Sequence, residues 1–432
     1  MEFLWIEGVK LPSFPQLQGE VNTDVLIIGG GMAGILCARK LADAGVDCVL
    51  LEGGEIGRGV TKGTTAVLSA QHDTLYRDFI KDFGQVKAKQ YLDANLSALG
   101  QISCLCADID CDFEVLPSVM YSRSDEGAMK SEAQAVNSLG FPAQFSKSTP
   151  LPFSVAGAVL YPNMAQFHPL KFLAGIAKGL NIYEHSFVHR LDGTTAYTRG
   201  GAVRANKVIV TTHFPFVNKH GFYYMKLYQK RSFVVAYENA PNLGCTIMDA
   251  AENGLYFRNY KDLLIIGGGD RRTGRGCGGY GVVREFAREY FPKAVEKYSW
   301  ANQDCMSLDG APYIGSYSAA MPGVFVATGF NEWGMTSSMV AANLLTELLT
   351  GRQATYAPVF APDRSVMSGQ LFANLGATAA DFVIPTRRRC PHMGAALRYN
   401  SEEHTWDCPC HGSRFTEAGG RLDNPAQGDA KV

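Results

Sequence analysis

The stretch DVLIIGGGMAGILCARKLADAGVDCVLLE, residues 24–52, constrains the fold of this chain more than any other segment. A short apolar run, typical of a buried strand, precedes apolar residues at helical spacing, and Gly45 can end that helix before a second apolar run begins. Gly29, Gly31 and Gly34 form the pattern G-x-G-x-x-G where the strand meets the helix. The stretch therefore predicts a β-α-β unit.

The three glycines and the end of the second strand predict a dinucleotide site. Gly29 permits a tight turn, Gly31 lets the backbone approach a pyrophosphate, and Gly34 lets the helix pack closely on the strand. Glu52 ends the second strand, where a carboxylate can accept a hydrogen bond from a ribose hydroxyl. A glycine-rich turn with a solvated Glu52 is the alternative, and these residues do not distinguish FAD from NAD.

The stretch CPHMGAALRYNSEEHTWDCPCHG, residues 390–412, contains two pairs of metal ligands, Cys390 with His392 and Cys408 with His411. A zinc finger would place two cysteines first and two histidines on a helix. A Rieske [2Fe–2S] centre instead needs two thiolates on one iron and two histidines on the other, so each half can supply one ligand of each kind. With HGSRF and the Pro425 loop after it, the stretch resembles Rieske domains. Zinc remains the alternative.

Four further segments, in consistent order, resemble the FAD-dependent oxidoreductases of the D-amino-acid oxidase superfamily. They are EGGEIGRGVTKGTTAVLSAQH (52–72), KVIVTTHFPF (207–216), DGAPYIG (309–315) and VFVATGFNEWGMT (324–336). This resemblance covers about residues 20–352. Together with the C-terminal stretch, it makes the chain similar to FAD-dependent oxidoreductases that carry a C-terminal Rieske domain.

The resemblance implies an α/β plus α+β fold. A Rossmann-like FAD-binding domain would be interleaved with an antiparallel-sheet substrate domain, and a small all-β Rieske domain would follow. The implied limits are 1–90, 156–220 and 301–352 for the FAD-binding domain, 91–155 and 221–300 for the substrate domain, 353–365 for a linker, and 366–432 for the Rieske domain.

The resemblance also implies which residues hold the two cofactors, FAD and the [2Fe–2S] cluster. Residues 64–66 would run beside the flavin pyrophosphate and ring, and residues 329–336 would place a helix N-terminus at the flavin pyrimidine, where it stabilises negative charge. The cluster ligands would be Cys390, His392, Cys408 and His411. The FAD-binding residues would be Gly29, Gly31, Met32, Ala33, Gly34, Glu52, Gly53, Arg58, Thr64, Thr65, Ala66, Val188, Thr212, Gly329, Trp333, Gly334, Met335 and Thr336.

Two features depart from the Rieske pattern. Many Rieske loops carry two further cysteines joined as a disulfide. Cys410 matches one of these positions, but Ala395 occupies the other. We therefore expect Cys410 to be a buried thiol without that bridge. Phe415 stands where high-potential relatives carry a tyrosine and offers no hydrogen-bond donor, whereas Ser413 can donate to a cluster sulfur. These features predict a reduction potential in the lower half of the Rieske range of roughly −150 to +300 mV.

The candidate catalytic residues are His72, Tyr256, Arg258 and Arg271. If the amine arrives neutral, hydride removal from its C–N bond mainly requires that the substrate be positioned over flavin N5. Arg258 could fork a substrate carboxylate, with a solvated strand arginine as the alternative. His72 follows the flavin-contacting segment and could face the ring or attach covalently to flavin, with ordinary packing as the alternative. Gln166 and His168 form a further candidate pair.

These features predict a flavin dehydrogenase. FAD would take two electrons from an amine or amino-acid-like substrate, and the Rieske cluster would pass them singly to an external acceptor. One alternative runs the electrons from the cluster to FAD for a reductive reaction. Another is an electron-transfer adaptor with a vestigial substrate pocket.

Charge and composition restrict the partners. A formal net charge of −1 and a pI near 6.8 argue against nucleic acid as a partner. No stretch reaches the roughly 18 apolar residues of a membrane span, and the start MEFLWIEGVKLPSFP lacks the pattern of a signal peptide. We therefore expect a cytoplasmic protein whose partners are a small-molecule amine and an external one-electron redox partner.

Overall fold

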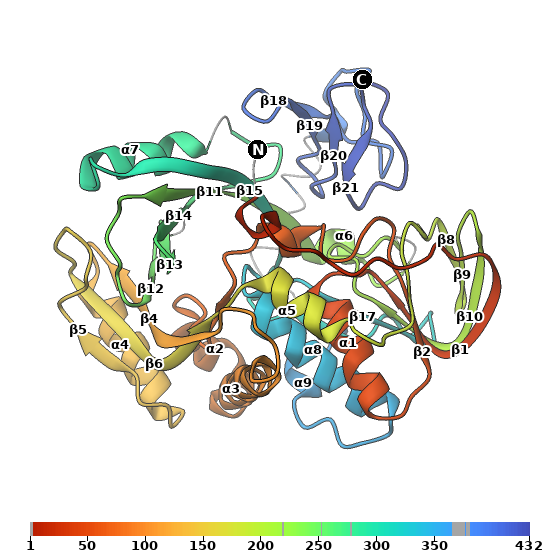
Figure 1. Cartoon of the computed structure of the whole chain (residues 1–432), viewed down its shortest axis with the longest axis horizontal. Helices are drawn as coiled ribbons and strands as arrows, with labels where there is room; N and C mark the ends of the chain where they lie inside the picture. The colour runs from red at the N-terminus through yellow and green to blue at the C-terminus, as the bar shows by residue number, and fades with distance from the viewer. Residues whose placement is uncertain (1–2, 218–219, 252, 277–278, 365–375, 377–380) are drawn as a thin grey trace.

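In the structure, a computed structural model, the described residues form three β-sheets (Figure 1). It describes residues 3–217, 220–251, 253–276, 279–364, 376 and 381–432. The predicted start of the C-terminal domain at 366 lies outside these described residues. No helix in the described part of the chain is long and apolar enough to cross a membrane.

The first sheet contains the predicted β-α-β unit. Its main order is β16-β17-β10-β1-β2-β7, and β1 pairs in parallel with both β10 and β2. All of β2 and the end of β1 are buried, as expected for parallel strands covered on both faces. The strands are β1 (Gly19–Ile28), β2 (Cys48–Leu51), β7 (Ile182–Tyr183), β8 (Arg190–Asp192), β9 (Thr195–Tyr197), β10 (Gly201–Val210), β16 (Tyr313–Ser316) and β17 (Val324–Thr328).

Helices α1 (Met32–Asp43) and α8 (Gly334–Leu349) pack against each other beside this sheet (Figure 1). Each begins just after the carboxyl end of a parallel strand, α1 after β1 and α8 after β17. The other helices are η1 (Leu4–Ile6), η2 (Val60–Gly63), α2 (Leu75–Phe83), α3 (Gln85–Cys106), α4 (Glu126–Ser138), α5 (Pro169–Ile176), α6 (Tyr223–Lys226), α7 (Tyr280–Tyr290) and α9 (Ala357–Phe360).

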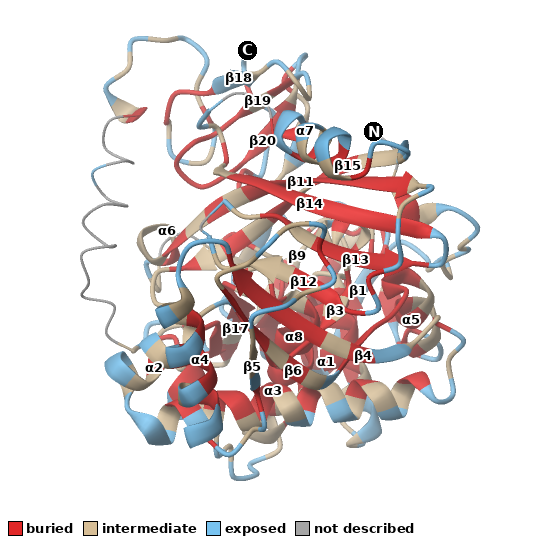
Figure 2. Cartoon of the chain, turned by 90° about the vertical axis from the view of Figure 1, so that its left-hand side faces the viewer, coloured by how far each residue is buried: buried red, intermediate tan, exposed pale blue. Residues whose placement is uncertain are grey.

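The second sheet is largely antiparallel, in the order β15-β11-β14-β13-β12-β4-β6-β3, with β5 beside β6. Figure 2 shows β11 and β14 buried along most of their length, and α7 packs on these two strands. The strands are β3 (Val67–Leu68), β4 (Glu114–Ser122), β5 (Gln144–Ser146), β6 (Gly157–Gln166), β11 (Leu227–Glu238), β12 (Thr246–Asp249), β13 (Tyr256–Tyr260), β14 (Leu263–Arg272) and β15 (Val295–Ser307).

The third sheet, at the C-terminus, is small and antiparallel. Its four strands are β18 (Arg398–Asn400), β19 (Thr405–Asp407), β20 (Arg414–Thr416) and β21 (Arg421–Asp423). They surround a separate small apolar core that includes Leu397 and Phe415. The expected architecture of a Rossmann-like unit, a sheet-based second unit and a small all-β C-terminal domain is confirmed.

At some of the predicted domain limits, the chain does not pass from one sheet to another. Residues 157–166 form β6 of the second sheet, although 156–220 was expected in the nucleotide-binding part. Residues 301–307 likewise belong to β15 of the second sheet. An apolar strand pattern indicates burial but not which sheet a strand joins, so the domain limits themselves stay predictions.

Candidate active site and metal centre

A cavity of about 540 Å³ is lined by residues from both larger sheets and from the C-terminal domain. It includes most of the residues that the sequence predicted, namely Gly29, Gly31, Met32, Ala33, Glu52, Gly53, Arg58, Thr64, Thr65, Val188, Thr212, Tyr256, Arg258, Gly329, Trp333, Gly334 and Met335. Of the predicted FAD-binding and catalytic residues, Gly34, Ala66, Thr336, His72 and Arg271 lie outside its lining, as do the further candidates Gln166 and His168 and the four cluster ligands.

The glycine turn between β1 and α1 leaves room for a ligand at one glycine only. Gly29 has φ +113°, and an added Cβ would lie 2.7 Å from the carbonyl oxygen of Thr211. A Cβ on Gly34 would lie 1.8 Å from the carbonyl oxygen of Gly29, so this glycine serves close packing rather than ligand contact. At Gly31 the nearest protein atom would be 3.5 Å away. The space in front of Gly31 suits a pyrophosphate at the helix N-terminus.

Glu52 is held where β2 ends. One carboxylate oxygen accepts a hydrogen bond from the Gly30 N–H at 2.7 Å and the other from the Gly54 N–H at 2.8 Å. Burial raises the pKa of Glu52, and these backbone bonds oppose that shift. The carboxylate lines the cavity in a fixed orientation, as a ribose acceptor requires.

The loop 63–66 is held by two tryptophans that the sequence did not indicate. The indole N–H of Trp300 donates to the carbonyl of Gly63 at 2.8 Å, and that of Trp5 donates to the carbonyl of Thr64 at 2.6 Å. Both rings are fully buried. Their partners lie 237 and 59 positions away along the chain, so no local pattern could reveal them.

The guanidinium of Arg258 hydrogen-bonds to the same loop instead of being left to bind a substrate carboxylate. Its Nη1 donates to the carbonyls of Thr65, Ala66 (3.0 Å) and Phe167 (3.4 Å). The residue is 1% exposed, and burial lowers its pKa to about 9. This geometry argues against both sequence interpretations, a carboxylate fork and a solvated strand arginine.

The turn before α8 directs the helix N-terminus at the cavity. Gly329 has φ +71°, and Asn331 ties the turn to β15 by accepting from the Ser307 N–H at 2.7 Å. No side chain caps α8, and its first residues Gly334 and Met335 line the cavity. The uncapped N–H groups and the helix dipole therefore favour negative charge there.

His72 lies behind the cavity wall, contrary to its predicted catalytic role. Its Nδ1 lies 2.8 Å from the Tyr91 hydroxyl and its Nε2 lies 3.0 Å from the Ser69 carbonyl oxygen. Its ring stacks on Trp333 with centroids 4.5 Å apart. Burial lowers the pKa of His72 to about 3, so it is neutral and supports Trp333, which itself lines the cavity.

Of the other candidates, Tyr256 lines the cavity and Arg271 does not. The Tyr256 ring lies over Gly267, where an added Cβ would meet ring atoms at 2.1 Å. Gln166 donates to Glu114 at 2.7 Å and to the carbonyl of Asn259 at 2.9 Å, which is a structural role.

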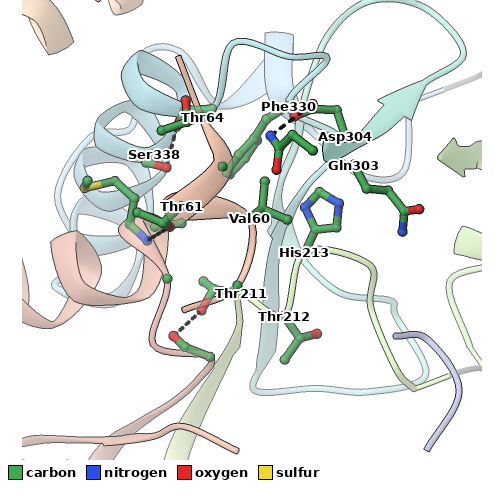
Figure 3. A pocket seen from close by; sticks show the side chains of 18 of the residues that line it. Val60, Thr61, Thr64, Thr211, Thr212, His213, Gln303, Asp304, Phe330 and Ser338 are labelled. Atoms are coloured by element: carbon green, nitrogen blue, oxygen red, sulfur yellow. Dashed lines mark hydrogen bonds between the residues drawn. The ribbon is translucent and has the colours of Figure 1, made fainter. Parts of the chain in front are cut away.

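The cavity wall above β11 and β15 carries carboxyl groups that the sequence did not indicate. Asp304 and Glu332 line it, and Lys230, opposite Asp304 in register, contacts Glu332 at 3.0 Å and Asp270 at 3.2 Å. Burial, followed by repulsion from Glu332, raises the pKa of Asp304 to about 7. Figure 3 shows Gln303, Asp304 and His213 among the side chains that line the cavity.

The two ligand loops of the C-terminal domain have the same hydrogen-bond pattern. Gly394 N donates to the Cys390 carbonyl and Gly412 N to the Cys408 carbonyl, both at 2.9 Å. Cys390 N donates to the Ala395 carbonyl and Cys408 N to the Ser413 carbonyl, both at 2.8 Å. The two loops therefore share one backbone turn, although the histidine follows the cysteine by two residues in the first loop and by three in the second.

The four predicted ligands form two pairs in space. The thiol groups of Cys390 and Cys408 interact with each other, and the rings of His392 and His411 lie 4.9 Å apart. Burial lowers the pKa of both histidines, which favours the neutral form that binds metals. The Nε2 of His411 lies 3.2 Å from the Tyr224 carbonyl oxygen, so His411 would offer its Nδ1 to an iron.

The positions that depart from the Rieske pattern lie close to these ligands. Cys410 is a buried thiol in the same small core as Ala395, as the sequence predicted. The Ser413 hydroxyl interacts with the thiol of Cys390 and also accepts from the Ala426 N–H at 3.0 Å. Phe415 is fully buried.

Two glutamines join the ligand loop to the wall of the cavity. Gln229 Nε2 donates to the His411 carbonyl at 2.6 Å, and Gln303 Nε2 donates to the Gly412 carbonyl at 2.8 Å. Gln303 also donates to Gln229 Oε1 at 2.7 Å and lines the cavity. A buried ion pair between Arg231 and Glu403 strengthens the same contact between domains. The sequence gives no local signal for these contacts.

Comparison with family models decides what the two sites hold. Residues 24–348 match the model described as FAD dependent oxidoreductase. The chain belongs to this FAD-dependent oxidoreductase family. Residues 377–432 match the Rieske [2Fe-2S] domain. FAD and a Rieske [2Fe–2S] cluster are its cofactors, and the zinc alternative is set aside.

Relatives of this FAD-dependent oxidoreductase share one or both units. The putative Rieske 2Fe-2S iron-sulfur protein YhfW of Bacillus subtilis is 31% identical over 98% of this chain and 96% of its own. The gamma-glutamylputrescine oxidoreductase of Escherichia coli is 25% identical over 79% of this chain and 87% of its own.

Solved structures confirm the fold of the first two units. Glycine oxidase from Geobacillus kaustophilus superposes with a TM-score of 0.68 at 20% identity, covering 80% of this chain and 99% of its own. L-proline dehydrogenase from P. horikoshii superposes with a TM-score of 0.67 at 15% identity, covering 81% and 98%.

Proposed function

We propose that this oxidoreductase removes a hydride from the C–N bond of an amine or amino-acid-like substrate, with FAD as the hydride acceptor and the Rieske cluster as the route by which electrons leave singly to an external acceptor. A hydride carries two electrons, so two molecules of a one-electron acceptor are reduced for each C–N bond oxidised to an imine.

The observation that carries this proposal is a pair of consecutive residues that reach both sites. His213 lines the flavin cavity, and the ring of the next residue, Phe214, lies 5.8 Å from the ring of His411 and 6.4 Å from that of His392. Burial lowers the pKa of His213 to about 4, so no fixed charge separates the sites at this point. The packed contact favours electron exchange within one chain.

The chemistry of the cavity wall supports an amine as the substrate. The carboxyl groups of Asp304 and Glu332 line the cavity, and the Lys230 ammonium contacts Glu332 and Asp270 beside them, so this wall offers oxygen acceptors to the N–H groups of an amine. Asp304 lines the cavity and titrates near neutral pH, so it can take the proton that an ammonium must lose before hydride removal.

The names of the relatives point to the same bond type. The Escherichia coli relative is a gamma-glutamylputrescine oxidoreductase, and the structural neighbours include a glycine oxidase and an L-proline dehydrogenase. Each name contains an amine or amino acid, which supports C–N oxidation as the reaction class.

Anaerobic mixing of the oxidised protein with a panel of amines and amino acids tests this proposal. A true substrate should bleach the flavin absorbance, and the electron paramagnetic resonance signal of a reduced Rieske centre should follow. The variant Cys408→Ser should still bleach its flavin but fail to reduce a one-electron acceptor, while Cys104→Ser, at an exposed cysteine, should behave as wild type.

The same experiment distinguishes the reverse direction. If the flavin stays oxidised with every compound tried but is reduced from a pre-reduced cluster, the reductive alternative replaces the proposal. If neither reaction occurs although both cofactors are present, the chain is an adaptor rather than a dehydrogenase.

A further inference from the structure

The C-terminal domain contributes directly to the wall of the flavin cavity. Residues 421–427, which comprise β21 and the loop after it, line the same cavity as the glycine turn and Glu52. The contact of His411 with the Tyr224 carbonyl and the two glutamine contacts hold this domain against α6 and against β11 and β15 of the second sheet.

The loop is anchored at its centre by Asn424. The side-chain amide of Asn424 donates to the carbonyls of Thr212 and Phe214, the latter at 3.1 Å, directly after β10. The Asn424 carbonyl in turn accepts from Gln229 at 3.3 Å. These bonds cross between the domains and fix the distance of the loop from the end of the parallel sheet.

Arg421 lies at the end of the cavity where the adenosine half of a dinucleotide belongs. Its guanidinium lies 4.1 Å from the centroid of the Phe187 ring. That ring is 2.9 Å from where a Cβ on Gly53 would stand, and Gly53 directly follows Glu52. Nη1 of Arg421 donates to the Ala426 carbonyl at 3.3 Å, which orients the guanidinium within its own loop.

The charge of Arg421 suits this place. Burial lowers its pKa, yet a guanidinium stays protonated in proteins. Arg58, from the flavin unit, lines the cavity as well. The pyrophosphate of FAD carries negative charge, and guanidinium groups match phosphate oxygens in geometry and charge.

We propose that the Rieske domain supplies part of the FAD-binding site, with Arg421 binding the adenosine-diphosphate half of FAD and Asn424 positioning the loop that covers it. FAD binding and docking of the Rieske domain are then linked, and by reciprocity each stabilises the other. This role is independent of the substrate and of the direction of electron flow.

The full-length protein with Arg421→Ala tests this role. After removal of FAD, titration with FAD followed by flavin fluorescence should show weaker binding, on the order of 10- to 100-fold, for loss of a charge-assisted contact. Arg421→Lys should recover part of the affinity, and Arg387→Ala, at an exposed arginine of the same domain, should match wild type. An unchanged Rieske electron paramagnetic resonance signal shows that the domain is folded. Affinity within about twofold of wild type in Arg421→Ala would overturn the proposal.

A second measurement needs no variant. If FAD and the docked domain stabilise each other, removal of FAD from the wild-type protein should speed the loss of cluster absorbance in the presence of an iron chelator. Equal rates with and without FAD would also overturn the linkage. Neither measurement depends on any substrate, so its failure is distinct from failure of the proposed dehydrogenase activity.

Discussion

Replacing Arg258 with methionine separates the two roles that this residue could have. If Arg258 bound a substrate carboxylate, its loss would weaken only the binding of acidic substrates. Because it instead donates to carbonyls of the flavin loop, its loss should lower both stability and FAD affinity. Methionine fills similar space but cannot donate to the carbonyls of Ala66 and Phe167, which are fully buried. The expected result for Arg258→Met is therefore a less stable protein that binds FAD more weakly.

The magnitude follows from the lost partners. The Ala66 carbonyl keeps the Phe167 N–H as a donor at 3.4 Å, so the substitution leaves one fully buried carbonyl, that of Phe167, without the donor seen here. A buried carbonyl left without a donor costs about 1–3 kcal/mol. The pKa of Arg258, lowered to about 9, shows that burying its charge is itself unfavourable, which places the net loss near the lower end of that range. A loss of about 1–2 kcal/mol lowers the melting temperature by roughly 2–8 °C in a protein unit of 150 to 250 residues, and somewhat less in a larger one.

Thermal melting and FAD titration of Arg258→Met, beside steady-state kinetics, check this expectation. Arg271→Met is the matched control because Arg271 is a half-buried arginine of β14 that does not line the cavity, so its loss should leave FAD affinity unchanged. The reasoning is refuted if Arg258→Met melts and binds FAD like wild type but raises KM selectively for substrates with a carboxylate.

Three further predictions follow from the site. The wild-type protein and His72→Ala should both bind FAD without a covalent link, so denaturation with acid should release all flavin from each into the supernatant. Flavin retained on the wild-type polypeptide would contradict the placement of His72 behind Trp333. With Asp304 as proton acceptor, its ionised form is active, so the rate of flavin reduction should rise with pH through about 7, the raised pKa of Asp304. Asp304→Asn should lose this rise and react about 10²- to 10⁴-fold more slowly, and an unchanged pH profile would exclude the role. Phe415→Tyr, which adds a donor in the fully buried core beside the ligands, should raise the potential of the cluster in a redox titration, while Ser413→Ala should lower it; opposite signs would show that other groups set the potential.

The local parts of both sites were predictable from the sequence. The glycine turn, Glu52 and the four cluster ligands are each defined by residues within a short stretch, and local spacing carries their chemistry. The cluster loops also contain the glycines that allow their matching turns, with φ +86° at Gly394 and +80° at Gly412. Family resemblance then placed FAD, which glycines alone did not identify.

The supporting residues were not predictable because their partners are far away in the chain. Trp300 holds the carbonyl of Gly63, and Gln303 holds that of Gly412, 109 positions later. A glutamine or tryptophan on a strand has no spacing that marks such a contact. The misjudged residues His72 and Arg258 follow the same rule, since burial and distant carbonyls, rather than neighbours in sequence, determine what each can do.

The fusion of the two units has a structural reason beyond carrying electrons. A separate Rieske protein could dock transiently and exchange electrons, but it would leave the Arg421 side of the flavin cavity open whenever it dissociated. In this chain Gln303 faces the cavity and binds the cluster loop, while Asn424 belongs to the cluster domain and binds the end of β10. Contacts therefore cross the boundary between the domains in both directions. A change that weakens FAD binding should also weaken the docking of the cluster domain. The proposed coupling of FAD binding to domain docking would give a reason for placing the Rieske domain in the wall of the flavin cavity.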